Sequence, residues 1–376
     1  MVELRELAGR RQLRDFVRVP FDLYGHCPQW VPPLIREELD TLDSAVNPAF
    51  EQAKARYWLA LYWGRAVGRV AAISLPPRSG TAGKTPLMRF GWFDAIDDAE
   101  VARALLAKVE HWAVEEGADH VNGPHGFCDL DPQGTLIEGF DQLPTIFTYY
   151  NHPYYPRLLE DCGYRKEIDY IEYRLRRSDN QALPEKVVRA ARLVEKRGGV
   201  RLLTFTSRRQ ALAWAKPMME VLNESFADIY GFTPLTARQI DYYRRKLFFF
   251  LEPRLLVGVL NPQERLVGFA IAMPSLSRAF QRARGRLWSW GWWHLWRGLH
   301  ERHTVDFCLV GVRGEYQGKG VPFLLQTWFH DVAMQMGFQY AESNPILENN
   351  LMSQGLFKYF QPQRHKRRRI FRKDLA

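Results

Sequence analysis

The stretch Leu309–Leu325, LVGVRGEYQGKGVPFLL, joins two apolar runs through a turn that contains Gly318, Lys319 and Gly320. The first run predicts a strand, and the second predicts the start of a helix. Because glycine has no Cβ, the N–H groups of Gly318 and Gly320 can approach a phosphate closely. The N-terminus of the helix adds a partial positive charge, and Lys319 adds a full one. The pattern predicts a phosphate-binding turn, with an ordinary solvent turn before a helix as the alternative.

Two familiar phosphate-binding signatures do not fit this turn. A Walker A loop needs a glycine where Arg313 stands, and a serine or threonine where Gly320 stands. A dinucleotide-binding fingerprint needs a third glycine at the position of Phe323. Nucleotide hydrolysis and dinucleotide binding of these two kinds are therefore excluded at this turn.

Composition indicates a folded protein with an anionic partner. The chain has 376 residues, which suits two domains, and a formal net charge of +10. That charge favours nucleic acid, an acidic membrane surface or a phosphorylated ligand. Four scattered cysteines argue against a disulfide framework or structural zinc, and the sequence shows no metal-binding spacing. Without a signal core or a span-length apolar run, we expect a cytoplasmic protein, with peripheral attachment to the inner membrane face as an alternative.

The two halves of the chain follow the same order of elements. The polar segment Arg176–Ala190 contains a proline and predicts a boundary between domains 1–178 and 179–376. Each half has a hairpin pattern, at 57–75 and 254–274, followed by an amphipathic helix and a short strand. The shared order predicts a duplicated α/β fold with a mixed sheet.

The turn and its flanks resemble the GNAT family of N-acetyltransferases. Residues 315–320, EYQGKG, match the family pattern Q/R-x-x-G-x-G/A at both glycines and depart from it at Glu315. The block NPILENNLMSQGLFKYF is similar to the family's next motif, an asparagine that opens a helix. Blocks such as WVPPL, GRAVGRVAA and EGFDQLPTIFTYYNHPYY extend the similarity to a bacterial group of tandem GNAT proteins that includes ceramide synthases. The resemblance implies two lobes, each a mixed, mostly antiparallel sheet flanked by helices.

The resemblance also implies an activity, the transfer of an acyl group from a coenzyme A thioester to an amine. The donor would lie between the strands Val305–Val312 and Gln339–Asn344, with a backbone N–H near Val310 on the thioester carbonyl. The residues expected to hold acyl-CoA are Val310, Gly311, Val312, Gln317, Gly318, Lys319, Gly320, Val321 and Asn350.

Asp306 and Glu342 are the carboxylates on these two strands, so they are candidates for the base that keeps the amine neutral. Ordinary structural carboxylates are the alternative for both. The family often places a tyrosine seven residues after the helix-opening asparagine, to protonate the leaving thiolate. Here Phe357 stands at that position, and a thiolate can leave without such an acid because free thiols titrate near roughly 8.5.

The first half has a different junction at the matching place. Asp97, Asp98 and Glu100 open its helix, and these carboxylates would repel pyrophosphate. We therefore expect the first lobe to share the fold without binding the donor. Its loop-rich segment Asn122–Tyr155 is the predicted site for the amine, at the junction of the lobes. The candidate substrate residues are His125, Asp129, Asp131, Glu138, Tyr150, Asn151 and Tyr154.

Two further segments have unusual composition. The insert 278–303 interleaves five tryptophans with arginines, a pattern that suits an anionic membrane surface, with a covered aromatic loop as the alternative and nucleic acid a third, weaker option. The basic run Arg364–Lys373 predicts a final strand with a solvated basic face.

Three functions follow from these patterns. The first is an acyl-CoA-dependent N-acyltransferase, with a long-chain sphingoid base as one acceptor. The second is a tandem-GNAT transferase that draws its acyl group from aminoacyl-tRNA. The third is a non-catalytic protein that binds acyl-CoA or membranes.

Overall fold

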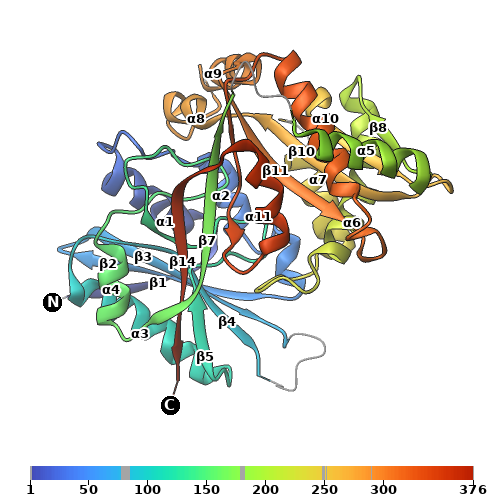
Figure 1. Ribbon diagram of the computed structural model, residues 1–376. Coiled ribbons are helices and arrows are strands. Elements are labelled where there is room, and N and C mark those ends of the chain that lie inside the picture. The colour runs from blue at the N-terminus through green and yellow to red at the C-terminus, as the bar shows by residue number, and fades with distance from the viewer. Residues whose placement is uncertain are drawn as a thin grey trace. The chain divides into compact units, whose positions relative to one another are not determined.

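The computed structural model describes residues 2–375 apart from 78–84, 178–182, 248–249, 251 and 289 (Figure 1). The chain forms two compact units. The first unit comprises Met1–Ile171, Ser277–His294 and Lys366–Ala376, and the second comprises Glu172–Leu276 and Leu295–His365. The sequence-based boundary at 178 lies outside the described residues.

The first unit is built on a sheet with strand order β1-β2-β3-β4-β5-β14. Neighbouring strands are antiparallel except β4 and β5, which are parallel, and β6 pairs with β14. Its strands are β1 (Glu3–Leu7), β2 (Lys54–Tyr62), β3 (Arg65–Leu75), β4 (Leu87–Ala95), β5 (His120–Gly123), β6 (Thr135–Glu138) and the C-terminal part of β14 (Gln363–Asp374). Its helices are α1 (Gly9–Tyr24), α2 (Ile35–Leu42), α3 (Ala99–Glu115), α4 (Tyr155–Asp161) and α8 (Ser277–Ala283), with a short η1 (Pro48–Glu51).

Two hydrophobic cores stabilise this unit. Leu105, Leu106 and Val109 of α3 pack in one core with residues of β3 and β4, and residues of α1 and α2 pack in the other. Trp63 and Gly64 both have positive φ, which is the geometry of a tight hairpin turn between β2 and β3. The first predicted hairpin is therefore confirmed.

The second unit has the strand order β7-β12-β11-β10-β9-β8, and only β11 and β12 run parallel. Its strands are β8 (Arg201–Thr204), β9 (Leu256–Leu260), β10 (Leu266–Pro274), β11 (Thr304–Val312), β12 (Tyr340–Glu342) and the C-terminal part of β7 (Arg165–Arg176), with β13 (Ile346–Leu347) paired to β7. Its helices are α5 (Glu185–Gly198), α6 (Arg208–Ser225), α7 (Ala237–Leu247), α10 (Val321–Gln335) and α11 (Leu351–Phe357), and α9 (Gly291–His300) is shared with the first unit. The 3-10 turns are η2 (Pro253–Leu255), η3 (Gly314–Tyr316) and η4 (Lys358–Phe360).

The same motif recurs in both units. An antiparallel strand, a crossover helix and a parallel strand appear as β4-α3-β5 and again as β11-α10-β12. Figure 1 shows the first motif in blue to teal and the second in orange to red. The mixed, mostly antiparallel sheet flanked by helices confirms the predicted fold class.

The basic final strand corrects one prediction. β14 forms as expected, but its basic face is not solvated, because Lys366 is 1% and Arg368 0% exposed. Lys366 donates to the carbonyl of Leu143 at 3.1 Å, and Arg368 donates to that of Tyr149 at 2.6 Å. These hydrogen bonds compensate for burying the two charges, which a charge pattern alone does not reveal.

Candidate active site

A fork between two parallel strands forms the centre of the site in the second unit. β11 and β12 pair over only three positions, from Thr304↔Tyr340 to Asp306↔Glu342. Beyond them the side chain of Asn344 donates to the carbonyl of Cys308 at 2.8 Å. The Oδ1 atom of Asn344 is buried and accepts no hydrogen bond from another described residue. The fork therefore presents one hydrogen-bond acceptor, Oδ1 of Asn344, and the edge of β11 beyond Asp306, which does not pair with β12.

β11 carries an irregularity at the fork. Its pairing with β10 shifts between Ile271 and Ala272, which leaves Cys308 as an extra residue. Farther along, Val310 is 38% exposed in the middle of an otherwise covered strand. The sheet is thus open where the sequence predicts the thioester.

The predicted phosphate turn lies directly after β11. Gly318 and Gly320 adopt φ of +75° and +82°, and Gly320 is the N-cap of α10. Among the described residues, none accepts a hydrogen bond from the N–H of Gly318, Gly320 or Val321. Three N–H groups at a helix N-terminus, beside the exposed Lys319, form a site suited to an anion.

Glu315 does not oppose this arrangement. Its carboxylate pairs with Arg265 at 3.3 Å, and both side chains are 53% exposed. The neighbouring Gln317, a predicted donor contact, donates from Nε2 to the carbonyl of Val312 at 3.1 Å and so holds the turn against the strand. Glu315 thus departs from the family pattern while its charge is partly offset by a surface cation.

Close packing requires glycine at two positions, Gly311 in β11 and Gly320 in the turn. A Cβ on Gly320 would lie 2.5 Å from Cγ2 of Val194 on α5, and one on Gly311 would lie 2.7 Å from the ring of Phe269. A Cβ on Gly318 would meet nothing within 4 Å. Glycine is therefore needed at 320 both for its close contact with Val194 and for its positive φ, whereas a side chain at 318 would extend into open space.

Asp306 and Glu342 are opposite each other in the strand register and are 0% and 7% exposed. Arg174 donates from Nε and Nη2 to Oε1 of Glu342 at 3.1 and 2.8 Å. On its other side, Oε2 of Glu342 lies 3.9 Å from Nε2 of His365, whose side chain is 3% exposed. The structure brings the two predicted carboxylates together and adds a histidine that lies far away in the sequence.

Phe357, which stands where the family often has a tyrosine, is packed between two rings. It stacks on Tyr173 at 5.8 Å between ring centroids and meets Phe307 edge-on at 5.8 Å. Asn350, a predicted donor contact, caps α11 by accepting from the N–H of Ser353 at 3.0 Å. The cap explains why an asparagine opens this helix, and a role in donor binding stays a prediction.

A small apolar cavity of about 80 Å³ lies along the C-terminal half of α10. Residues 329–334 are two to three turns from the start of α10, or roughly 12–20 Å at 1.5 Å per residue. The lining includes Phe307, Phe329, Ala333, Met334, Phe338 and Phe360. The cavity can therefore accept hydrocarbon at a distance from the phosphate turn.

The matching junction of the first unit is filled by the protein itself. Asp98 caps α3 by accepting from the N–H of Glu100 at 2.7 Å. Beyond the short β4–β5 pairing, the N–H of His125 donates to the carbonyl of Phe90 at 2.8 Å, and Arg89 donates to the carbonyl of Gly126 at 3.2 Å. A carboxylate thus stands at this helix N-terminus, in contrast to the open turn before α10.

Several predicted amine-binding residues bond to the backbone of the first unit. Asp131 accepts from the N–H of Phe127 at 2.8 Å, and Asn151 accepts from that of Leu136 at 2.6 Å. Tyr154 donates to the carbonyl of Ala95 at 2.8 Å. These contacts give the three side chains a structural role.

The other candidates in this segment are more varied. Tyr150 is buried, Asp129 is partly buried, and Glu138 lies 3.4 Å from Arg367 on the surface. His125 is 3% exposed and lies 3.0 Å from Oε1 of Gln133. Binding of an amine by any of these residues stays a prediction.

The described residues contain neither a cluster suited to a metal ion nor a membrane-spanning helix. No group of three or more His, Cys, Asp or Glu side chains is placed to hold a metal ion. No helix in the described ranges is long and apolar enough to cross a membrane.

Known proteins resemble this chain in sequence and in fold. No family model matches the chain. The chain is 28% identical over 378 residues to Protein YghO of Escherichia coli (strain K12), covering 99% of this chain and 95% of that protein. It is 28% identical over 373 residues to the bacterial ceramide synthase of Caulobacter vibrioides (strain NA1000 / CB15N), covering 97% and 95%. A solved tandem GNAT protein from the clavulanic acid biosynthesis pathway aligns over 100% of this chain and 99% of its own, with a TM-score of 0.55 and 14% identity. The chain has the tandem GNAT fold, which confirms the resemblance inferred from its sequence.

Proposed function

We propose that this chain is an acyl-CoA-dependent N-acyltransferase whose second unit binds the donor and passes its acyl group to an amine. The observation that carries the proposal is the turn before α10, where the N–H groups of Gly318, Gly320 and Val321 are open beside Lys319. Anions bind at such helix N-termini because backbone dipoles and unpaired N–H groups converge there. The adjacent fork is the proposed place for the rest of the donor.

Residues of the turn and the fork are the proposed contacts for the pyrophosphate, the pantetheine arm and the thioester of the donor. The turn would hold the pyrophosphate, and the buried Oδ1 of Asn344 would accept from an amide N–H of the pantetheine arm. When bound, coenzyme A supplies the acyl group as an activated thioester. The exposed edge of β11 near Val310 would donate a backbone N–H to the thioester carbonyl, where negative charge develops during attack.

Glu342 and His365 are the proposed proton-accepting pair. An attacking amine must be neutral, and imidazole is the side chain whose ordinary pKa lies nearest neutrality. Glu342 is already paired with Arg174, so it is better suited to orient His365 than to accept a proton itself. Asp306, opposite Glu342 in the register, is the alternative base.

A lipid acyl chain is the proposed cargo. The apolar cavity lined by Phe307, Phe329 and Phe360 offers hydrocarbon surface beyond the fork. The relative named bacterial ceramide synthase supports a long-chain amine, such as a sphingoid base, as the acceptor.

The test is a transfer assay with purified chain, palmitoyl-CoA or acetyl-CoA, and a panel of amines that includes sphingoid bases. Mass spectrometry should detect an amide product that forms faster with palmitoyl-CoA. Binding of palmitoyl-CoA without any amide product would support the non-catalytic alternative. Acyl transfer to the amine from aminoacyl-tRNA, with none from acyl-CoA, would support the tRNA-dependent alternative.

Two pairs of variants separate the assigned roles. Ala333→Trp fills the cavity and should raise KM for palmitoyl-CoA while sparing acetyl-CoA, whereas Gln335→Trp, on the exposed end of the same helix, should change neither. His365→Gln should lower kcat by about 10²–10⁴-fold, the usual contribution of a general base. Unchanged kcat in His365→Gln together with a large loss in Asp306→Asn would assign the base to Asp306.

A further inference from the structure

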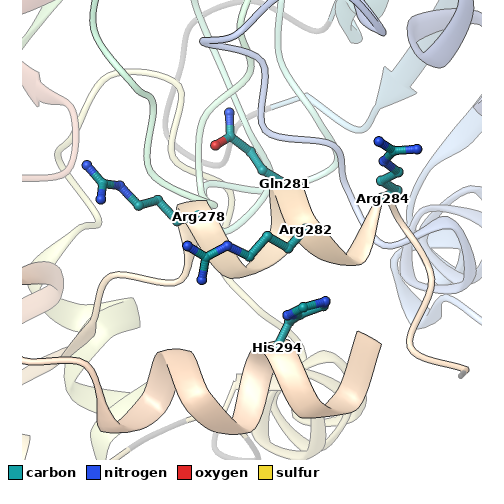
Figure 2. A pocket seen from close by; sticks show the side chains of 5 residues that line it. All are labelled: Arg278, Gln281, Arg282, Arg284 and His294. Carbon is teal, nitrogen blue, oxygen red and sulfur yellow. The ribbon is translucent and has the colours of Figure 1, made fainter. Parts of the chain in front are cut away.

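A second cavity lies in the first unit, outside the proposed active site, and three of its five lining side chains are arginines. Its volume is about 550 Å³, and its lining consists of Arg278, Gln281, Arg282, Arg284 and His294. Figure 2 shows Arg278 and Arg282 extending from α8 to the same side, with His294 rising toward them from α9. The cavity has the chemistry of an anion-binding site.

No carboxylate of the described chain neutralises this cavity. Arg278, Arg282 and Arg284 make no side-chain hydrogen bond or ion pair with any described residue. The sequence between Ser277 and His300 contains five arginines and neither aspartate nor glutamate. Three guanidinium groups that line one cavity without a carboxylate partner among the described residues favour an external anion.

The wall of the cavity is anchored rather than loose. Gln281 donates to the carbonyls of Pro28 and Trp30 at 2.7 and 3.0 Å, and Ser277 donates to that of Pro144 at 2.7 Å. Gly285 has φ of +74°, and its carbonyl accepts from the N–H of Ile35 at 2.9 Å. The arginines of α8 are therefore presented from a fixed element.

Four exposed tryptophans lie in the sequence between Arg284 and His294, two residues that line the cavity. Trp288, Trp290, Trp292 and Trp293 are 91%, 72%, 58% and 39% exposed. Large exposed apolar groups that occur together mark a surface that contacts something else. Indole rings favour the depth of lipid headgroups, and arginines beside them attract anionic lipid.

We propose that the segment 278–294 docks on an anionic membrane, with a lipid phosphate held in the cavity and the indoles inserted among the headgroups. The proposal commits to lipid because phosphate chemistry alone would not require the tryptophans. It does not depend on the proposed acyl transfer, since its residues lie outside the second unit's fork.

The test is cosedimentation of the full chain with vesicles. Binding to phosphatidylglycerol vesicles should exceed binding to phosphatidylcholine vesicles and should fall as salt is raised, because exposed charges are screened. Arg278→Glu with Arg282→Glu should weaken that binding at least tenfold, and Trp288→Ser with Trp290→Ser should weaken it as well. Arg14→Glu with Arg18→Glu makes the same change of charge on exposed α1 and should have little effect. Each variant is accepted only if its thermal unfolding matches that of the unmodified chain.

Several results would overturn the proposal. These are equal binding to the two kinds of vesicle, an equal loss in the α8 and α1 charge variants, or unchanged binding in the tryptophan variant. Binding of inorganic phosphate or single-stranded DNA at this cavity, without vesicle binding, would overturn it in favour of those ligands.

Discussion

Replacing Gly318 by alanine tests the phosphate turn, and Gly337 provides a matched control. Both glycines flank α10 and have similar positive φ, +75° and +80°, and a Cβ at either would meet nothing within 4 Å. Placing alanine in this left-handed conformation lowers the free energy of unfolding by roughly 1–2 kcal/mol. Both variants should therefore lose about the same stability, which urea denaturation measures.

Binding of coenzyme A should separate the two variants. The methyl group at 318 enters open space within the proposed phosphate turn, whereas the one at 337 lies at the far end of the helix. Losing one hydrogen bond to a charged group costs about 1.5–3 kcal/mol. Since about 1.4 kcal/mol corresponds to a tenfold change, Gly318→Ala should raise Kd for coenzyme A by roughly 10–150-fold. Gly337→Ala should leave Kd unchanged in the same calorimetric titration. Equal affinities in both variants, or an equal loss in both, would refute the assignment of the phosphate to this turn.

Three further predictions concern stability and reactivity. Gly320→Ala should lower the free energy of unfolding by about 1–2 kcal/mol through backbone strain and by about 1–3 kcal/mol through overpacking against Val194. Adding Val194→Ala should recover the overpacking loss, which urea denaturation of the single and double variants measures. Burial and the charge of Arg89 lower the pKa of His125 well below 6.5, so the unfolded state takes up more protons as pH falls through 6.5. The free energy of unfolding should therefore decrease from pH 7 to 5, and His125→Asn should make that decrease smaller. The same pH dependence in the variant and the unmodified chain would contradict this role of His125. Burial raises the pKa of the Cys308 thiol. Mass spectrometry should therefore show that iodoacetamide at pH 8 does not alkylate Cys308 until denaturant is added.

The duplicated motif shows how one geometry serves two purposes. α3 and α10 both begin after a strand and cross over to a parallel partner. In the first unit the carboxylate of Asp98 satisfies N–H groups at the start of the helix. In the second unit Gly320 has no side chain to do so, and the N–H groups stay open. The difference between a capped helix and a candidate anion site thus depends on one side chain.

Much of this arrangement followed from the sequence alone. Pairs of β-rich runs around short turns predicted the two hairpins, and the helical spacing of apolar residues before Gly117 and Gly337 predicted the two crossover helices. Acidic residues at 97–100 and glycines at 318 and 320 distinguished the two junctions. These signals are local, because a strand, a cap and a turn each depend on residues close together in the chain.

Only the tertiary structure decided what distant residues do together. His365 lies 23 positions from Glu342 in the sequence, yet folding places its Nε2 atom 3.9 Å from that carboxylate. Charge patterning predicted a solvated final strand, whereas folding buries Lys366 and Arg368 against backbone carbonyls that no local pattern identifies. The same holds for the three arginines of the cationic cavity, which have no carboxylate partner in the described part of the chain, a fact visible only in three dimensions. Sequence patterns determine local conformation, but the charge and solvation of a side chain depend on neighbours that only the fold supplies.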